Sequence, residues 1–281
     1  MSQASIWGQL KGGAAAGILA GGRPYARNIY YTGDNSPQFG GIVSASIQAA
    51  VDAMVDGDVL LLGPQEYNED VVITGKNGIT IVGASPALGT RLTGLPSNGI
   101  GLTIVGGQDV QLVNMNLEGR GTGGALKLMG QIRRLSALGC KFNGGAFGVL
   151  VAPAAGGQIV DFLMDECYFG PVTTGFSNAL AGGDPTHRVV IKNSIFSAVV
   201  TDCIVSAGSC INIAVVNNIF GTHTDVEPTR FIKLDGAGDS GIVAGNQFAT
   251  ATNANTKFVL DADVYWTANG TEAGWSAARP A

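Results

Sequence analysis

A chain of 281 residues with 43 glycines, a net charge of −5 and only 13% charged residues has little material for a solvated helical surface. Its acidity and its lack of basic clusters argue against nucleic acid as a partner. The composition favours short strands and turns, and a repeat that continues almost to the C-terminus favours one domain.

Residues 1 to 30 do not match the repeat that follows, and we expect them to form an extended N-terminal arm. Residues 12 to 22 are a small apolar run rich in glycine and alanine. The run is too short to span a bilayer, and its glycines make a poor hydrophobic region for a secretion signal. A structural arm or docking segment is therefore favoured over a signal, and no membrane partner is expected.

The rest of the chain, residues 31 to 281, is predicted to be a single domain that begins with a capping helix over residues 44 to 55. Serines at the start of this segment suit helix capping, and its apolar stripe includes Ile47, Val51 and Met54. A solenoid needs such a cap because its open end would expose sheet edges and core.

After this helix come the turn Asp56-Gly-Asp, an apolar strand over residues 59 to 62, the residues Gly63, Tyr67 and Glu69, and the sequence Ile-Thr-Ile-Val-Gly ending at Gly83. This order resembles the N-terminal part of pectin-lyase-like β-helix proteins over about 40 residues. The resemblance implies a right-handed parallel β-helix. It does not imply one activity, because pectinesterases, lyases and many viral β-helix proteins share this part.

A similar phrase returns six times between residues 110 and 248, and each copy ends on a large apolar residue. These ends lie 24 to 28 residues apart, at Leu117, Phe142, Phe169, Phe196, Phe220 and Phe248. Such a period is typical of a solenoid. Three residues before each end stand Asn114, Gly139, Glu166, Asn193, Asn217 and Gly245. Because Asn and Gly tolerate left-handed backbone, we expect a sharp corner there.

A third short strand in each turn completes the prediction of an all-β, right-handed parallel β-helix of about seven coils. The coils extend from about residue 59 to about residue 260. Residues 261 to 281 are expected to form a C-terminal cap, in which aromatic side chains cover the last coil.

The four cysteines are predicted to be free thiols rather than metal ligands. Cys140 and Cys167 fall on the same inward position of consecutive coils, at a spacing that also permits a disulfide. A buried thiol is a good small hydrophobe, so we favour free thiols. No Cys-x-x-Cys pair is present, and His187 and His223 stand apart in the sequence, so we expect no zinc and no cofactor.

One pair of residues resembles an enzyme motif. Asp161-Phe162 is similar to the start of the Asp-Phe-Ile-Phe-Gly motif of pectinesterases, which would make Asp161 one of two carboxylates beside glutamines and an arginine. Met164-Asp165 replaces the end of that motif, and the Leu-Gly-Arg-Pro-Trp segment of the family is missing. We therefore expect Asp161 to be a solvated strand residue.

Other acidic residues offer weaker candidates. Asp165, Glu166 and Asp202 could belong to a calcium site of a lyase, although an ordinary acidic surface is favoured. The longest departure from the repeat, residues 221 to 228, contains Asp225 and would hold His223 and Glu227 in any active loop, while Asp235 follows it. A contact loop explains it equally well, and no catalytic, cofactor-binding or metal-binding residue is assigned.

The sequence looks like the small β-helices of bacteriophage virions that lack a catalytic set. That resemblance implies a non-enzymatic structural protein, either a capsid decoration (cement) protein or a tail-associated one. It would be located in the virion, form a homotrimer and dock on major capsid or tail proteins through its arm and lateral faces. The alternative is a polysaccharide-active pectin-lyase-like enzyme or a glycan-binding tailspike-type module, which would give it a surface glycan as partner.

Overall fold

The structure is a computed structural model that describes residues 28–32, 41–84, 89–96, 99–152, 157–179, 184–221, 228–249, 257–271 and 274–276. The predicted arm therefore lies outside the described residues except at its end, as do His223, Asp225 and Glu227. Ile29 and Tyr30, which we had assigned to the arm, belong instead to β1 (Ile29–Thr32), which pairs in parallel with β3 (Val59–Leu62).

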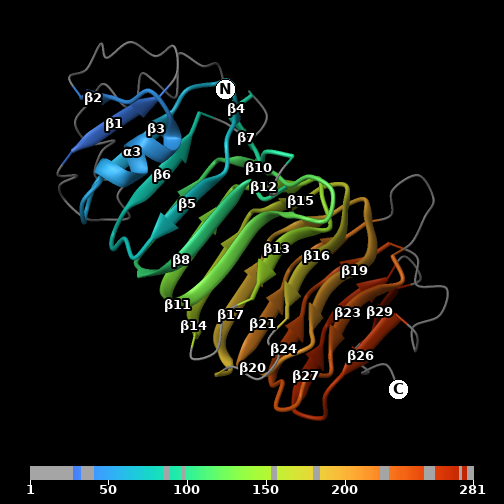
Figure 1. Ribbon diagram of the computed structural model, residues 1–281. Coiled ribbons are helices and arrows are strands. Elements are labelled where there is room, and N and C mark those ends of the chain that lie inside the picture. Colours follow the sequence, from blue (N-terminus) through green and yellow to red (C-terminus); the bar gives the residue numbers. More distant parts are fainter. Residues whose placement is uncertain are drawn as a thin grey trace.

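The chain forms an all-β, right-handed parallel solenoid of about eight turns, close to the seven predicted (Figure 1). Each coil contributes strands to three faces, and the faces differ in the length of their strands. The first face holds β1, β2 (Ile42–Val43), β3, β6 (Thr80–Gly83), β9 (Gln111–Val113), the end of β11 (Gly124–Leu138), β14 (Ile159–Asp165), β17 (Thr186–Lys192), β20 (Cys210–Ile211), β21 (Ile213–Val216), β24 (Gly241–Ala244) and β27 (Val264–Thr267).

The second face continues the same sheet around a bend. It holds β5 (Val71–Thr74), β8 (Leu102–Gln108), the start of β11, β13 (Phe147–Val151), β16 (Val172–Asn178), β19 (Val199–Ser206), β23 (Arg230–Leu234) and β26 (Phe258–Leu260). The third face is a separate sheet of short strands. It holds β4 (Glu66–Asn68), β7 (Arg91–Thr93), β10 (Asn116–Glu118), β12 (Lys141–Asn143), β15 (Tyr168–Phe169), β18 (Ile195–Phe196), β22 (Ile219–Phe220), β25 (Gln247–Phe248), β28 (Asn269–Thr271) and the antiparallel β29 (Gly274–Ser276).

The six repeat ends form one column of the core, as predicted. Leu117 is in register with Phe142, and the five phenylalanines follow one another in adjacent coils. Neighbouring rings in this phenylalanine column lie 4.2 to 5.2 Å apart between centroids. Residues 264 to 271 form a further parallel coil, although we expected the coils to end near residue 260. In that coil, Trp266 of β27 stacks on Phe248 at 5.9 Å and meets Phe258 at 4.9 Å.

The predicted corner is present in every copy of the repeat. All six residues three positions before the ends have positive φ, from 51° at Asn193 to 66° at Gly245. Four of the six are not glycine, and left-handed backbone is uncommon for such residues. The corner turns the chain between the first and third faces, so the alternation of inward and outward side chains shifts by one residue there.

Close to this corner the C-terminal coils carry a buried asparagine ladder, formed by Asn218, Asn246 and Asn269. Each side chain accepts a hydrogen bond from a backbone N–H of the preceding coil: Asn218 from Ser194, Asn246 from Asn218 and Asn269 from Asn246. The amide groups also donate to carbonyls of the coil interior. These buried amides therefore satisfy backbone groups that a corner would otherwise leave unpaired.

The capping helix α3 spans Ile47–Ala53, which is shorter than the predicted residues 44 to 55. It begins after Ser46, whose hydroxyl accepts from the Ala49 N–H, and Glu69 accepts from both Ile47 and Gln48 N–H groups. At the other end, Lys76 donates to the carbonyl of Met54. Contacts with residues of later coils thus fix both ends of α3, and helix propensity alone does not predict where these ends lie. Within the described chain, no helix is long and apolar enough to span a membrane.

We expect replacement of Glu69 by alanine to lower the free energy of unfolding by about 1–2 kcal/mol, since two N–H groups at the first turn of the helix lose their acceptor. Chemical denaturation of the purified variant measures the change. The exposed Glu66, three residues earlier, is the matched control, and its alanine variant should leave the stability nearly unchanged. Equal effects of the two substitutions would refute this role of Glu69.

All four cysteines are free and buried, which confirms the prediction of free thiols at Cys140 and Cys167. Burial raises the pKa of the Cys140 thiol to about 12 and also raises that of Cys167. These thiols are therefore protonated and poorly reactive in the folded protein, and they fill the core as small apolar groups.

Candidate functional site

A row of alternating charges follows one corner of the solenoid, just before the inward residues of the first face. It consists of Asp109, Arg134, Asp161 and Arg188, one residue from each of four successive coils. All four have positive φ, between 53° and 60°. Because successive coils stack at about 4.8 Å, these side chains stand beside one another along the rod. We call this row the charge ladder.

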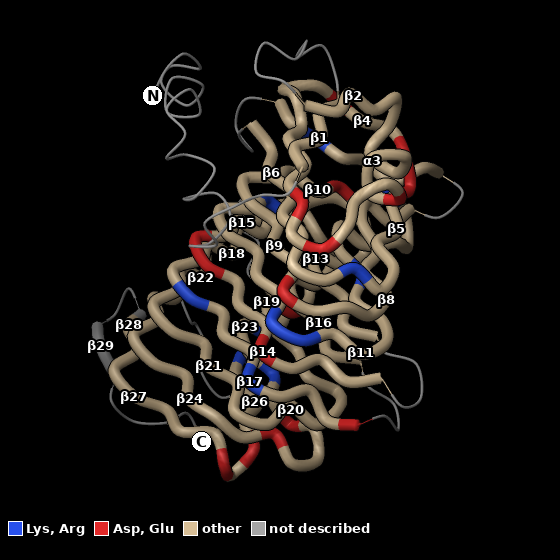
Figure 2. Tube along the Cα trace, turned by 90° about the vertical axis from the view of Figure 1, so that its left-hand side faces the viewer, with Lys and Arg blue, Asp and Glu red and all other residues tan. Residues whose placement is uncertain are grey.

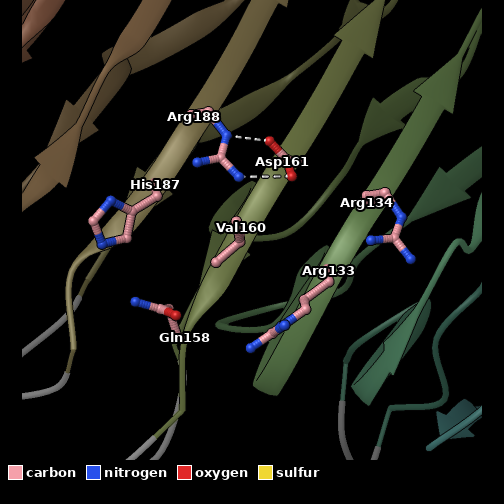
Figure 3. A pocket seen from close by; sticks show the side chains of 7 residues that line it. All are labelled: Arg133, Arg134, Gln158, Val160, Asp161, His187 and Arg188. Carbon is pink, nitrogen blue, oxygen red and sulfur yellow. Dashed lines mark hydrogen bonds and ion pairs between the residues drawn. The ribbon is translucent and has the colours of Figure 1, made fainter.

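Two bidentate ion pairs hold the charge ladder together. Arg134 donates to both carboxylate oxygens of Asp109, from Nε at 2.7 Å and from Nη2 at 2.8 Å. Arg188 donates in the same way to Asp161, with Nη2 2.9 Å from Oδ2 (Figure 3). In the second pair, Arg188 is 55% and Asp161 39% exposed, so solvent screens the attraction and the pair adds little to stability. Its main effect is to fix the direction of the guanidinium.

The ion pairs also set the protonation of the ladder. The Arg188 guanidinium, through its hydrogen bonds, lowers the pKa of the Asp161 carboxyl. In return, the Asp161 carboxylate raises the pKa of Arg188, and Asp109 raises that of Arg134. Asp161, Arg134 and Arg188 therefore stay charged at neutral pH, and Asp161 is a poor proton donor.

Beside the ladder lies a hollow of about 360 Å³ that is open to solvent. Arg133, Val160 and His187 form its second row, in register with one another in three successive coils. Among the described residues, the lining consists of Arg133, Arg134, Gln158, Val160, Asp161, His187 and Arg188 (Figure 3). Figure 2 shows basic and acidic segments near β14 and β17 on a trace that is otherwise mostly uncharged.

Positive charge exceeds negative charge in this hollow. Among the described residues, the lining holds three guanidinium groups, one imidazole and the Asp161 carboxylate. Arg188 is paired with Asp161 and Arg134 with Asp109, so the excess positive charge is that of Arg133. The Arg133 side chain is exposed and makes no ion pair with another described residue. Guanidinium groups bind carboxylate, sulfate or phosphate groups through paired hydrogen bonds. The lining thus suits an anionic, oxygen-rich ligand and does not suit a metal cation.

A catalytic pair of carboxylates is not formed around Asp161 within the described chain. The residues in register with it in the neighbouring coils are Arg134 and Arg188, both cationic. Glycoside hydrolysis ordinarily needs two carboxyl groups about 5–9 Å apart across the bond that is cleaved. Arg188 binds Asp161 and Gln158 lines the same hollow, but neither register neighbour of Asp161 supplies the second carboxylate that the pectinesterase resemblance implies.

The other acidic candidates lie apart from the hollow. Asp165 binds Lys192 at 3.0 Å and the Asn193 amide at 2.9 Å, and Glu166 forms the next corner. Asp202 is held by Arg230 on the second face, and Asp235 by Lys233. No group of three or more His, Cys, Asp or Glu side chains within the described ranges could hold a metal ion.

Asp161 faces solvent, as expected, with its side chain 39% exposed, but the sequence did not predict the bidentate ion pair with Arg188. A signal for the ladder was present in the sequence. Eight residues before the repeat ends stand Asp109, Arg134, Asp161 and Arg188, and opposite charges alternate at that position. We had also expected His187 to stand alone, whereas it lies in the hollow with three arginines.

Comparisons with known proteins agree on the fold. No protein-family model and no curated protein matches the sequence. Among solved structures, a pectin methylesterase from carrot is similar with a TM-score of 0.56 and 12% identity, over 88% of this chain and 82% of that one. For pectin methylesterase PemA from Erwinia chrysanthemi the TM-score is 0.54 and the identity 10%, over 91% of this chain and 92% of that one.

A pectin methylesterase from Aspergillus niger gives a TM-score of 0.54 at 14% identity, over 88% of this chain and 87% of that one. The chain has the parallel β-helix fold of these proteins. At such low identity the similarity concerns architecture alone, so the chemistry has to be argued from this chain's own side chains.

Proposed function

We propose that the protein is a glycan-binding β-helix, in which the hollow beside the charge ladder holds an anionic polysaccharide. The observation that carries this proposal is the gathering of Arg133, Arg134 and Arg188 around one open hollow on a protein whose net charge is −5. Local positive charge on an acidic protein needs a reason, and an anionic ligand supplies one.

The arrangement of the arginines supports a ligand that extends along the rod. Asp109 and Asp161 hold Arg134 and Arg188 in fixed directions, so little side-chain entropy is lost when a ligand binds them. Arg133 and His187 stand two coils apart, roughly 10 Å by strand spacing. A sugar chain laid along the row would meet the Arg133 guanidinium at one level and the His187 imidazole two coils further on.

Binding without turnover is the form of polysaccharide recognition that the residues favour. Arg188 keeps Asp161 ionised, which removes it as a general acid, and the described hollow has no second carboxylate. The raised pKa values of Arg134 and Arg188 make both guanidinium groups poor bases for a lyase reaction.

Arg133 gives the sharpest test, because no described ion pair depends on it. We expect Arg133→Ala to weaken binding of a soluble polyuronate about tenfold or more, since a charge-assisted hydrogen bond contributes roughly 1.5–3 kcal/mol. Isothermal titration calorimetry at low and at moderate salt measures the loss. The wild-type affinity should fall as salt is added, because exposed charges are screened.

The matched control is Arg120→Ala, which removes an exposed arginine that contacts Asn68 on the third face. This variant should bind as the wild type does, and a neutral glucan should bind to neither protein. Equal losses for the two arginine variants would indicate general charge attraction and would reject the site. Product formation from the polyuronate, abolished by Asp161→Ala, would reject binding without turnover.

The bacteriophage virion role, the homotrimer and the docking on capsid or tail proteins remain predictions from the sequence. A glycan-binding rod is compatible with the tailspike-type module that was the alternative. Electron micrographs of the source particle would test this placement. Copies arrayed on virions would support it, and their absence from intact particles would reject it.

A further inference from the structure

Asp239 is a carboxyl group buried in the C-terminal half of the solenoid, and the charge ladder does not use it. It lies in the turn between β23 and β24 and is completely inaccessible to solvent. Its oxygens accept hydrogen bonds from the Cys210 N–H at 2.7 Å and from the Gly236 N–H at 2.9 Å. The side chain thus joins its own turn to the preceding coil.

A third contact of Asp239 involves the buried hydroxyl of Ser206. The Ser206 Oγ lies 3.0 Å from Asp239 Oδ1 and 2.6 Å from the carbonyl oxygen of Gly208. It also accepts a hydrogen bond from the Asn178 amide at 3.1 Å. A hydroxyl has a single hydrogen to donate, so it cannot serve both acceptors at once.

The protonation of Asp239 decides whether this cluster is satisfied. If the carboxyl is ionised, Ser206 must donate either to it or to Gly208, and two acceptors 3.0 Å and 2.6 Å away share one hydrogen. If the carboxyl carries a proton on Oδ1, that proton goes to Ser206 and the Ser206 hydrogen goes to Gly208. Every donor and acceptor in the cluster then has a partner, which a buried polar cluster requires.

We propose that Asp239 is a proton-binding joint: its carboxyl is neutral in mildly acidic solution, and losing the proton loosens the contact between the two coils that it connects. This inference stands on the hydrogen-bond geometry and does not depend on glycan binding. The cluster continues from Asn178 to Thr186, whose hydroxyl is 3.2 Å from the Asn178 amide oxygen. Thr186 directly precedes His187, so the joint supports the coil that carries one wall of the hollow.

The charges around the joint agree with this assignment. Burial raises the pKa of Asp239 to about 6, and the carboxylate of Asp261 raises it further, against the hydrogen bonds from Cys210, Gly236 and Ser206. The Cys210 thiol, which is the titratable group on the facing strand, has a raised pKa and stays neutral. On the same segment, Asp235 forms its ion pair with Lys233.

The direction of the pH effect follows from this raised pKa. The folded joint holds the proton with a pKa of about 6, against 3.8 for an ordinary aspartate, so protonation favours the closed joint. The stabilisation is complete at pH values below the ordinary pKa and is lost as the pH rises through about 6. The equilibrium constant for closing the contact between the two coils should fall about 50-fold between about pH 4 and about pH 7.

The experiment is a titration of the native protein, labelled with ¹³C, in which the Asp239 carboxyl resonance is followed by NMR. We expect a midpoint near pH 6, and a midpoint at or below about 4 would overturn the proposal. Hydrogen exchange of the Cys210 and Gly236 amides supplies a second readout. Their protection should fall about 50-fold over the same range after correction for the intrinsic exchange rate.

Two variants separate the joint from general pH effects. Asp239→Asn should abolish the pH dependence of protection at Cys210 and Gly236. Asp235→Asn, which removes an exposed carboxyl from the same turn, should leave it unchanged. If wild-type protection at these two amides does not change with pH, the proposal fails, whatever the glycan assays give.

Discussion

Replacing Asn246 by alanine is expected to lower the free energy of unfolding by about 4 kcal/mol. The Asn246 side chain is completely buried and makes four hydrogen bonds. Its oxygen accepts from the backbone and side-chain nitrogens of Asn218, and its nitrogen donates to Val215 and Asn269. Alanine leaves the Asn218 N–H without its acceptor, which costs about 1–3 kcal/mol, and removes three further hydrogen bonds at about 0.5–1.5 kcal/mol each. Asn218 keeps its bond to Ile191 and Asn269 keeps the one from the Asn246 N–H, so the costs add up to less than their sum.

Chemical denaturation of the Asn246 variant and of Gln247→Ala tests this value. Gln247 is the next residue in the chain, but its side chain is exposed, so its loss should change stability by less than about 0.5 kcal/mol. A cost below about 1 kcal/mol for Asn246→Ala would mean that water or a local shift of the backbone supplies new partners to the groups that Asn246 binds. The asparagine ladder would then not be a main source of stability.

Replacing Phe196 by alanine is expected to cost about 3–5 kcal/mol, because it opens a cavity in the middle of the phenylalanine column. Phe196 is inaccessible to solvent, and its ring centroid lies 4.2 Å from that of Phe169 and 4.8 Å from that of Phe220. Each coil of a solenoid is stabilised mainly by its neighbours, so a central gap weakens the coupling of the two halves.

The neighbouring residue supplies a matched control on the other side of the same strand. Ile195 points outward and is 40% exposed, so Ile195→Ala should cost less than about 1 kcal/mol. A denaturation midpoint measured for both variants decides the question. Equal costs would contradict the assignment of Phe196 as the inward residue, and with it the register of the repeat.

Much of the fold could be predicted from the sequence because the repeat places like residues in like environments. Aligning the copies on their last residue gave the phenylalanine column and the corner at Asn114 and its equivalents, all of which have positive φ. The steric limits on backbone dihedral angles act within each coil, so their effect on residue choice can be recognised in a single sequence. The ends of α3 could not be predicted in this way, because they are fixed by Glu69 and Lys76, which lie about 20 residues further along the chain.

The candidate site was harder to predict, because its signal lies in side-chain pairing between coils. Asp161 attracted attention through a motif, and the missing parts of that motif led to the expectation of a solvated residue. Its partner Arg188 stands 27 residues later, and the two meet only when the coils are stacked in the correct register. Arg133 and His187 share no motif, and it is the hollow that brings them together.

The central claim is that the hollow beside the charge ladder binds an anionic glycan, and mapping a bound oligouronate by NMR tests it most directly. We predict that saturating oligouronate perturbs the side-chain Nε–H resonances of Arg133, Arg134 and Arg188 and the ring of His187. The Arg120 resonance on the third face should stay unchanged. Perturbation of Arg120 alone, or no perturbation at any of the hollow's arginines while the ligand binds, would contradict the account.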